Sequence, residues 1–347
     1  MFGLAYAPSF GAVIALLMIA ILSSPLLFLH SPLATGVAEG GSARSVNVAL
    51  LIAFLAGGAN LVFIINSVGA DPSMMFDFEG ISEIAVKSTI NRYEENVDSN
   101  SGNPLILALS LFIVFYIKLN EDGLIKSSLA LIPILLYSIF TTEKWPSFLG
   151  VVFFLCAIFA GGIEQQRRHL AKILALLGVV LILMMLTLII RSGSEDVFEI
   201  FPHFGNYLFA QYKGFGDWFV NEYDSDILGL GPSSFMGPLN ALGFIRRESG
   251  GGFSSYELYG LESNIYTAFR YLLSDFGVLG VFLINTGIVV VFNYLGKVGA
   301  RSMQLSLYCF MLFCAILSIN VTPFAHNSTA LAIAVSSLYF GIYKLRA

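Results

Sequence analysis

Nine apolar runs divide most of this chain, and each is about as long as the roughly 20 residues that cross a bilayer core. They occupy residues 9–30, 47–66, 103–119, 124–142, 146–163, 171–190, 274–295, 303–320 and 328–344. Hydrophobic residues make up 56% of the chain and charged residues 12%, whereas roughly a quarter of a soluble domain is charged. We therefore predict an all-α polytopic membrane protein with about nine transmembrane helices, within a range of about 8 to 11, folded as one integral domain over residues 1–347.

Basic residues predict the orientation, because Lys and Arg in short connections favour the cytoplasmic side. Four basic segments fall on one side of an alternating path, and they contain Arg167, Arg168, Lys172, Lys118, Lys126, Lys297, Arg301, Lys344 and Arg346. The opposite face then receives segment 67–102, the turn 142–146, the long stretch 191–273 and the turn 322–327. We therefore expect one large outer loop over residues 191–273.

The predicted spans contain few charges away from their ends. Asp275 lies at the outer end of the seventh run, with Arg270 just before it. Ion-coupled transporters usually need ionisable groups within the membrane and often have paired repeats, and neither pattern is evident. This argues against a transporter, although that alternative stays open.

Neither a metal nor another cofactor is predicted. The three cysteines, Cys156, Cys309 and Cys314, fall inside apolar runs, where a thiol behaves as a small hydrophobic group. The compact acidic pair Asp224 and Asp226 resembles an ordinary turn. No feature suggests a nucleic-acid partner.

Two shorter outer segments carry charged groups. Residues 81–90 repeat their apolar side chains at helical spacing, which predicts a helix in the membrane interface with a charged face. In the turn 142–146, Lys144 either contacts an anion or extends to the interface. Glu143 beside it is either a base or the ion-pair partner of Lys144.

Aromatic residues are dense in the first part of the long loop, residues 198–223. Their spacing of about 3.6 predicts a helix lying on the membrane surface, and the residues that carry it are Phe204, Leu208, Tyr212, Phe215 and Phe219. Tyr207, Tyr212 and Trp218 instead offer faces on which sugar rings can stack. Both interpretations stay open.

Arginines accompany the glycines in the second part of the loop. Arg246 and Arg247 lie between the glycines at 229–231 and those at 250–252. A guanidinium binds phosphate with two parallel hydrogen bonds that lysine cannot copy. The pair therefore predicts a phosphate clamp, with binding of lipid headgroups as the alternative.

The third part leads into the seventh run. If residues 262–270 are helical, Glu262, Tyr266 and Arg270 share one face. Charge near membrane depth is expensive and is usually functional, so Arg270 is predicted to bind substrate. Ion pairing with Glu262 is the alternative.

A resemblance to a known family rests on three short motifs. Gly229 and Gly231 form a Gly-x-Gly element, residues 264–270 read Asn-x-Tyr-Thr-x-Phe-Arg, and residues 275–280 read Asp-Phe-Gly-x-x-Gly. This order resembles the Wzy-type oligosaccharide repeat unit polymerases, which are related to the O-antigen ligases. The predicted topology with one large outer loop is also similar, so the resemblance covers most of the chain.

The resemblance implies a GT-C-like, inverting and metal-independent glycosyltransferase. It would transfer a growing glycan from undecaprenyl pyrophosphate to another lipid-linked repeat unit, at the periplasmic face of a bacterial inner membrane. The product would be O-antigen, capsule or exopolysaccharide. The implied partners are undecaprenyl-pyrophosphate-linked oligosaccharides, membrane lipid and a Wzz-type chain-length regulator.

Family members are associated with essential arginines in periplasmic loops, and the arginines of the long loop match them by position. The predicted substrate-binding residues are Arg191, Arg246, Arg247, Arg270, Lys144, Asn264 and Tyr266. Ser263 stands where ligases often place a histidine, which favours a polymerase over a ligase. Transfer to another acceptor, as in a ligase, is the nearest alternative.

Breaking a glycosyl–pyrophosphate bond builds negative charge on the leaving group, which fixed cations can stabilise. The acceptor hydroxyl also needs a proton acceptor. The candidate catalytic residues are His326, Glu143 and Asp275, with Glu262 and His203 as rivals.

Overall fold

Helices form most of the chain that the structure describes, together with one hairpin of two short strands. The computed structural model describes residues 10–24, 43–93, 103–121, 123–141, 143–160, 178, 182, 185, 212–224, 229, 231–245, 256–258, 261–263, 267–317, 324 and 326–346. Its elements are α2 (Phe10–Ser23), α3 (Ala43–Val68), η2 (Pro72–Phe76), α4 (Phe78–Tyr93), α5 (Pro104–Asn120), α6 (Ile125–Thr141), α7 (Lys144–Ala160), α10 (Met236–Ala241), β1 (Tyr256–Leu258), β2 (Leu261–Ser263), α11 (Ala268–Lys297), α12 (Arg301–Leu317) and α13 (Asn327–Arg346). A further helix is described at residues 212–221.

The predicted apolar runs coincide with helices wherever the structure describes them. Most of the run 171–190 lies outside the described residues, apart from Gly178, Ile182 and Met185, which are helical, and so do residues 25–30, 161–163 and 318–320 of three other runs. Local sequence explains where helices begin. At α5, for example, Asn103 Oδ1 accepts a hydrogen bond from the backbone N–H of Leu105 at 2.9 Å, and Pro104 occupies the first turn.

Length and composition make two of these helices candidates for crossing a membrane. They are Ala43–Ser67 in α3 and Ala268–Lys297, which is α11. Five shorter apolar helices accompany them, namely Pro104–Asn120, Ile125–Thr141, Trp145–Ala160, Arg301–Leu317 and Asn327–Ile342. The prediction of about nine spans therefore stays a prediction.

Contacts divide the chain into two compact units. The first unit comprises Met1–Ala34, Pro202–Ala330 and Ser337–Arg346, and the second comprises Thr35–Phe201, Leu331–Ser336 and Ala347. A single integral domain over residues 1–347 remains the prediction from sequence.

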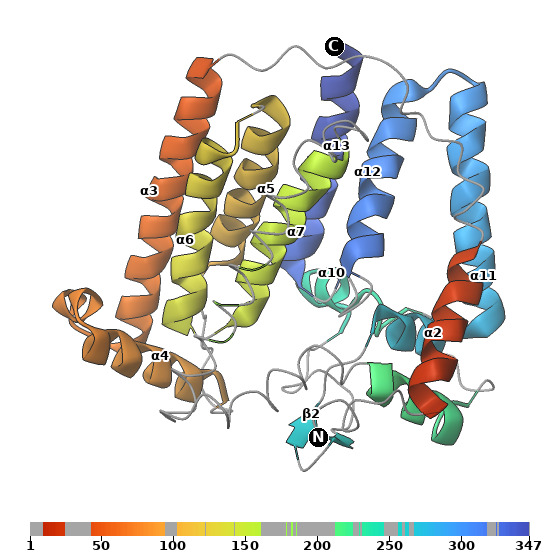
Figure 1. The fold of residues 1–347 in the computed structure, drawn as a ribbon, viewed down its shortest axis with the longest axis horizontal. Coiled ribbons are helices and arrows are strands. Elements are labelled where there is room, and N and C mark those ends of the chain that lie inside the picture. Colours follow the sequence, from red (N-terminus) through yellow and green to blue (C-terminus); the bar gives the residue numbers. More distant parts are fainter. Residues whose placement is uncertain are drawn as a thin grey trace. The chain divides into compact units, whose positions relative to one another are not determined.

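The second unit is a helical bundle with one crosswise helix. Helix α3 packs against α5 and α6, and α7 packs against α5 and α6. Helix α4 lies across the ends of α3 and α6 (Figure 1). Its residues Ile84, Ala85 and Ser88 are buried, so the predicted helix over 81–90 is confirmed, with one face against the bundle.

The contact between α3 and α6 depends on a glycine. Pro133 lies inside α6, and a Cβ on Gly57 would overlap the Pro133 ring. At the neighbouring Gly58, a Cβ would meet no atom within 4 Å. The two glycines thus form a matched pair, with one at a tight helix crossing and the other in open space.

We expect Gly57→Ala to lower the free energy of unfolding by roughly 1–3 kcal/mol, because overpacking forces the two helices apart. Gly58→Ala should be neutral, or stabilising by up to about 1 kcal/mol through helix propensity. Thermal unfolding of the detergent-purified variants measures both. Equal melting temperatures for the two alanine variants would contradict this account of the crossing.

The first unit is organised around α11. Asn285 Nδ2 of α11 donates a hydrogen bond to the backbone oxygen of Leu22 in α2 at 2.7 Å. The apolar cluster here joins α2, the helix at 212–221 and α11, through Leu22, Phe215, Trp218, Phe269, Leu273 and Val281. Helix α12 packs against α11 and crosses α13 at Gly341, where a Cβ would overlap Ser306 Oγ.

Candidate functional site

Arg270 is a buried cation in the first turn of α11. Its side chain is 3% exposed, and its backbone N–H donates to the oxygen of Thr267 at 3.1 Å. Burying a charged group away from water is costly unless charge or hydrogen bonds compensate. Of the predicted substrate-binding residues, Arg270 is the one whose side chain the structure describes.

Trp218 supports Arg270 from the helix at 212–221. The guanidinium carbon lies 5.1 Å from the centre of the indole ring, within the distance of about 6 Å at which cations are attracted to aromatic faces. Trp218 is 8% exposed and also contacts Phe215 and Tyr223, at ring distances of 6.0 and 5.3 Å. The ring thus lies in the protein core, and its contact with Arg270 is one that the spacing of aromatic residues did not predict.

The helix at 212–221 confirms the predicted helical pattern over its described part. Phe215 is fully buried in the apolar cluster, whereas Phe204, Tyr207 and Leu208 lie outside the described residues. Lys213 and Asp217 form an ion pair one helical turn apart. Burial raises the pKa of the Tyr212 hydroxyl.

The N-terminus of α11 lies next to Arg270. Thr267 occupies the N-cap position without a side-chain capping bond, and its fully buried Oγ1 has no hydrogen-bond partner among the described residues. A helix N-terminus carries partial positive charge and four amides that need acceptors. Arg270 adds a full positive charge to this end, so the arrangement favours an anion.

One prediction about this segment is wrong. Glu262 lies in strand β2, where it pairs with Glu257 of β1, and Thr267 before the helix is extended. The helix starts at Ala268, so Glu262 and Arg270 do not share a helical face. The spacing of four residues suits a helix, but pairing of β1 with β2 satisfies the backbone groups of this stretch instead.

Asp275 is fully buried, and its carboxylate accepts two backbone hydrogen bonds. Oδ1 accepts from the N–H of Ser233 at 3.3 Å, and Oδ2 accepts from the N–H of Ser234 at 2.5 Å. A carboxylate held in this way anchors a loop. The prediction that Asp275 is catalytic stays untested by this geometry.

The Asp-Phe-Gly-x-x-Gly motif has a structural explanation. Gly277 interrupts α11 with φ 66° and ψ 175°, a conformation that is essentially restricted to glycine. The Phe276 ring packs edge-on against Phe235, at 6.4 Å. A Cβ on Gly280 would come within 2.9 Å of Phe276 Cβ, so a larger residue there would crowd the kink.

His326 lies at the N-terminus of α13. It is half-buried, and its carbonyl accepts the N–H of Ala330 at 3.0 Å. Gly237 of α10 packs directly on this turn, because its N–H donates to the oxygen of Phe324 at 2.8 Å and a Cβ would lie 2.9 Å from the His326 carbonyl carbon. His326 is therefore held against the segment that follows the Gly-x-Gly element.

The remaining predicted site residues divide into two groups. Glu143 and Lys144 belong to the second unit, where the Glu143 N–H donates to Thr141 Oγ1 at 3.3 Å and Lys144 begins α7. The others lie outside the described residues, namely Arg191, Arg246, Arg247, Asn264, Tyr266 and the rival His203. Their roles stay predictions.

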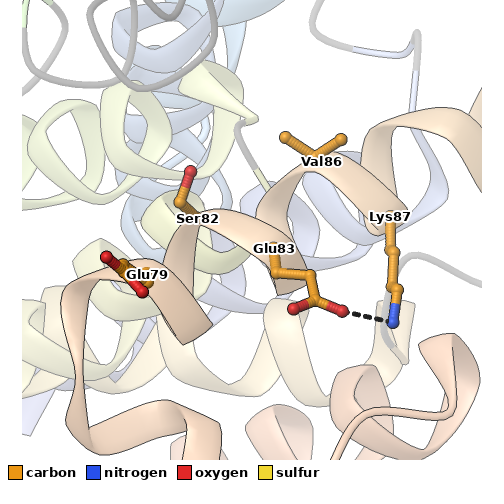
Figure 2. A pocket seen from close by; sticks show the side chains of 5 residues that line it. All are labelled: Glu79, Ser82, Glu83, Val86 and Lys87. Atoms are coloured by element: carbon orange, nitrogen blue, oxygen red, sulfur yellow. Dashed lines mark ion pairs between the residues drawn. The ribbon is translucent and has the colours of Figure 1, made fainter.

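A shallow depression on α4 has the character of a solvated helix surface. Its lining residues all come from this one helix, and they are Glu79, Ser82, Glu83, Val86 and Lys87. Figure 2 shows the ion pair between Lys87 and Glu83, whose charged atoms lie 2.7 Å apart. Because these side chains are 43% and 51% exposed, the pair contributes little stability, and we assign no site here.

The sequence did not predict three features of the site. They are the position of the Arg270 guanidinium over the Trp218 ring, the anchoring of Ser233 and Ser234 by Asp275, and the contact of Gly237 with the turn before α13. Each feature joins segments that are far apart in the chain, so the spacing of residues within one segment cannot predict it. Within the described ranges, no three His, Cys, Asp or Glu side chains gather closely enough to hold a metal ion.

Comparison with known proteins identified no relative of this chain. No protein-family model matches the chain, and no curated protein and no solved structure matches it.

Proposed function

We propose that this protein is a membrane glycosyltransferase that polymerises undecaprenyl-pyrophosphate-linked repeat units at the periplasmic face of a bacterial inner membrane. The observation that supports it best is a buried arginine, whose guanidinium lies over the Trp218 ring, at a helix N-terminus that has no side-chain cap. Cation and helix end together suit a diphosphate. The proposal also rests on the motif resemblance and on about nine apolar segments of span length.

In the proposed reaction, the bond between the anomeric carbon and the diphosphate oxygen breaks. A hydroxyl of the acceptor sugar attacks the same carbon from the opposite face, so the configuration inverts. The hydroxyl proton passes to a basic residue, for which His326 is the candidate that we propose. The diphosphate leaves on its lipid carrier while Arg270 and the amides at the start of α11 stabilise its charge.

Glycan profiles of a strain that lacks the gene test this proposal. We expect the ladder of polymerised glycan to collapse to a single repeat unit on its final anchor, and the wild-type gene to restore the ladder. Loss of all surface glycan, including the single unit, would indicate ligation or export instead. An unchanged ladder would exclude every role in this pathway.

A further inference from the structure

A glycine-containing loop, which we call the glycine loop, is hydrogen-bonded to the first part of α11. We use this name for Gly229 together with residues 231–235. The Gly229 N–H donates to the backbone oxygen of Ser274 at 2.9 Å, and the N–H groups of Ser233 and Ser234 donate to the Asp275 carboxylate. Three backbone amides of one loop thus bond to two consecutive residues of α11.

This attachment depends on glycine at position 229. A Cβ there would lie 2.5 Å from Asp275 Oδ1, a contact that only displacement of the loop or of the carboxylate can relieve. Gly231 adopts φ 117°, which side chains rarely allow. The Gly-x-Gly element therefore brings backbone up to Asp275, whereas its sequence alone suggested approach to a ligand.

The same loop is also fastened to the turn that carries His326. The Phe235 ring lies 5.1 Å from the Phe324 ring, and two residues later Gly237 bonds to the Phe324 carbonyl. The glycine loop and Gly237 therefore bridge α11 and the start of α13.

Arg270 belongs to the part of α11 that the loop holds. Residues 268–276 precede the kink at Gly277, and Arg270 lies one helical turn before Ser274. Because this short segment is helical, a shift at Ser274 or Asp275 moves Arg270 as well. The loop thus connects the position of the buried cation with the position of His326.

We propose that Asp275 is a positioning residue of the candidate site. By accepting hydrogen bonds from the amides of Ser233 and Ser234, it fixes the position of Arg270 relative to the turn that carries His326. This inference rests on the proposed function for its effect on transfer. It assigns Asp275 no proton transfer, in contrast to the catalytic role predicted from sequence.

Hydrogen exchange tests the anchoring without any assay of activity. In the full-length protein in lipid nanodiscs, we expect the amides of residues 233 and 234 to exchange about 10- to 100-fold faster in Asp275→Ala than in wild type. Gly229→Ala should have a similar effect, and Asp275→Asn a smaller one, because its amide oxygen still accepts one bond. Gly287→Ala is the control, since a Cβ there meets nothing within 4 Å.

The rate of glycan transfer tests the positioning role. The substrate is the lipid-linked repeat unit isolated from the strain that lacks the gene. We expect Asp275→Asn to retain clearly more activity than Asp275→Ala. We also expect Gly229→Ala to lose activity, although the Asp275 carboxylate is still present in that variant. Equal inactivation by Asn and Ala, with Gly229→Ala fully active, would identify Asp275 as a proton acceptor and overturn the proposal.

Two further outcomes separate this inference from the proposed function. Unchanged exchange at residues 233 and 234 in Asp275→Ala would refute the anchoring, whatever the enzyme does. Faster exchange without any transfer by the wild-type protein would leave the anchoring standing, but would refute both the polymerase and the positioning role that depends on it.

Discussion

Arg270→Ala should lower the rate of glycan transfer by about 10²- to 10³-fold, the usual effect of removing one donor that stabilises developing negative charge. Arg270→Lys should lower it by roughly tenfold, because lysine keeps the charge but loses the planar pair of donors. The physical basis is the position of Arg270, which is 3% exposed and lies at the positive end of α11. Transfer rates with the purified lipid-linked unit measure both variants.

Two controls separate substrate binding from other roles of Arg270. Arg301→Lys changes an exposed arginine at the start of α12 and should leave the transfer rate unchanged. Glu262→Gln tests the alternative ion pair. Glu262 is also a rival proton acceptor, and loss of that role would change the pH profile of transfer. If Glu262→Gln reduces transfer as strongly as Arg270→Ala with an unchanged pH profile, the arginine serves that ion pair, and its assignment to the diphosphate fails.

Gly277→Ala should have the largest effect on structure and activity together. The conformation at Gly277, φ 66° and ψ 175°, costs other residues about 1–3 kcal/mol. Relief of this strain straightens α11 and moves the segment that carries Arg270. We expect a lower melting temperature and a loss of transfer on the order of 10²-fold, since small displacements of a binding group have effects of this size.

Gly287→Ala provides the matched control for the kink. It lies on the same helix, and a Cβ there meets no atom within 4 Å. Its melting temperature and transfer rate should match those of the wild type. If Gly277→Ala has the melting temperature and the transfer rate of the wild type, the kink is unnecessary. Other contacts would then determine the position of Arg270.

Much of the helical fold could be predicted from the chain, because apolar runs of span length and amphipathic spacing are local properties. The run at 47–66 lies within α3, and the pattern over 81–90 lies within α4. Lengths were less predictable. The run at 274–295 does not reveal that α11 begins at Ala268, or that Gly277 divides it.

The contacts around Arg270 and Asp275 could not be predicted from the sequence. The cost of charge near membrane depth led to the prediction that Arg270 binds substrate, and this stays a prediction. The helical face shared with Glu262 was wrong, because strand pairing overrode the spacing. The Gly-x-Gly and Asp-Phe-Gly motifs are far apart in the sequence, although Gly229 and Asp275 lie against each other in the structure. Only the folded chain shows that contact, since 46 positions separate the two residues in sequence.

The central claim is that this protein joins lipid-linked repeat units and releases the diphosphate carrier. The most direct measurement reconstitutes the purified protein in liposomes with units isolated from the strain lacking the gene, and follows both products. The account predicts lengthened lipid-linked glycan and one undecaprenyl pyrophosphate released for each new glycosidic bond, with both products nearly absent for Arg270→Ala. Wild-type protein that neither lengthens the glycan nor releases the carrier would contradict it.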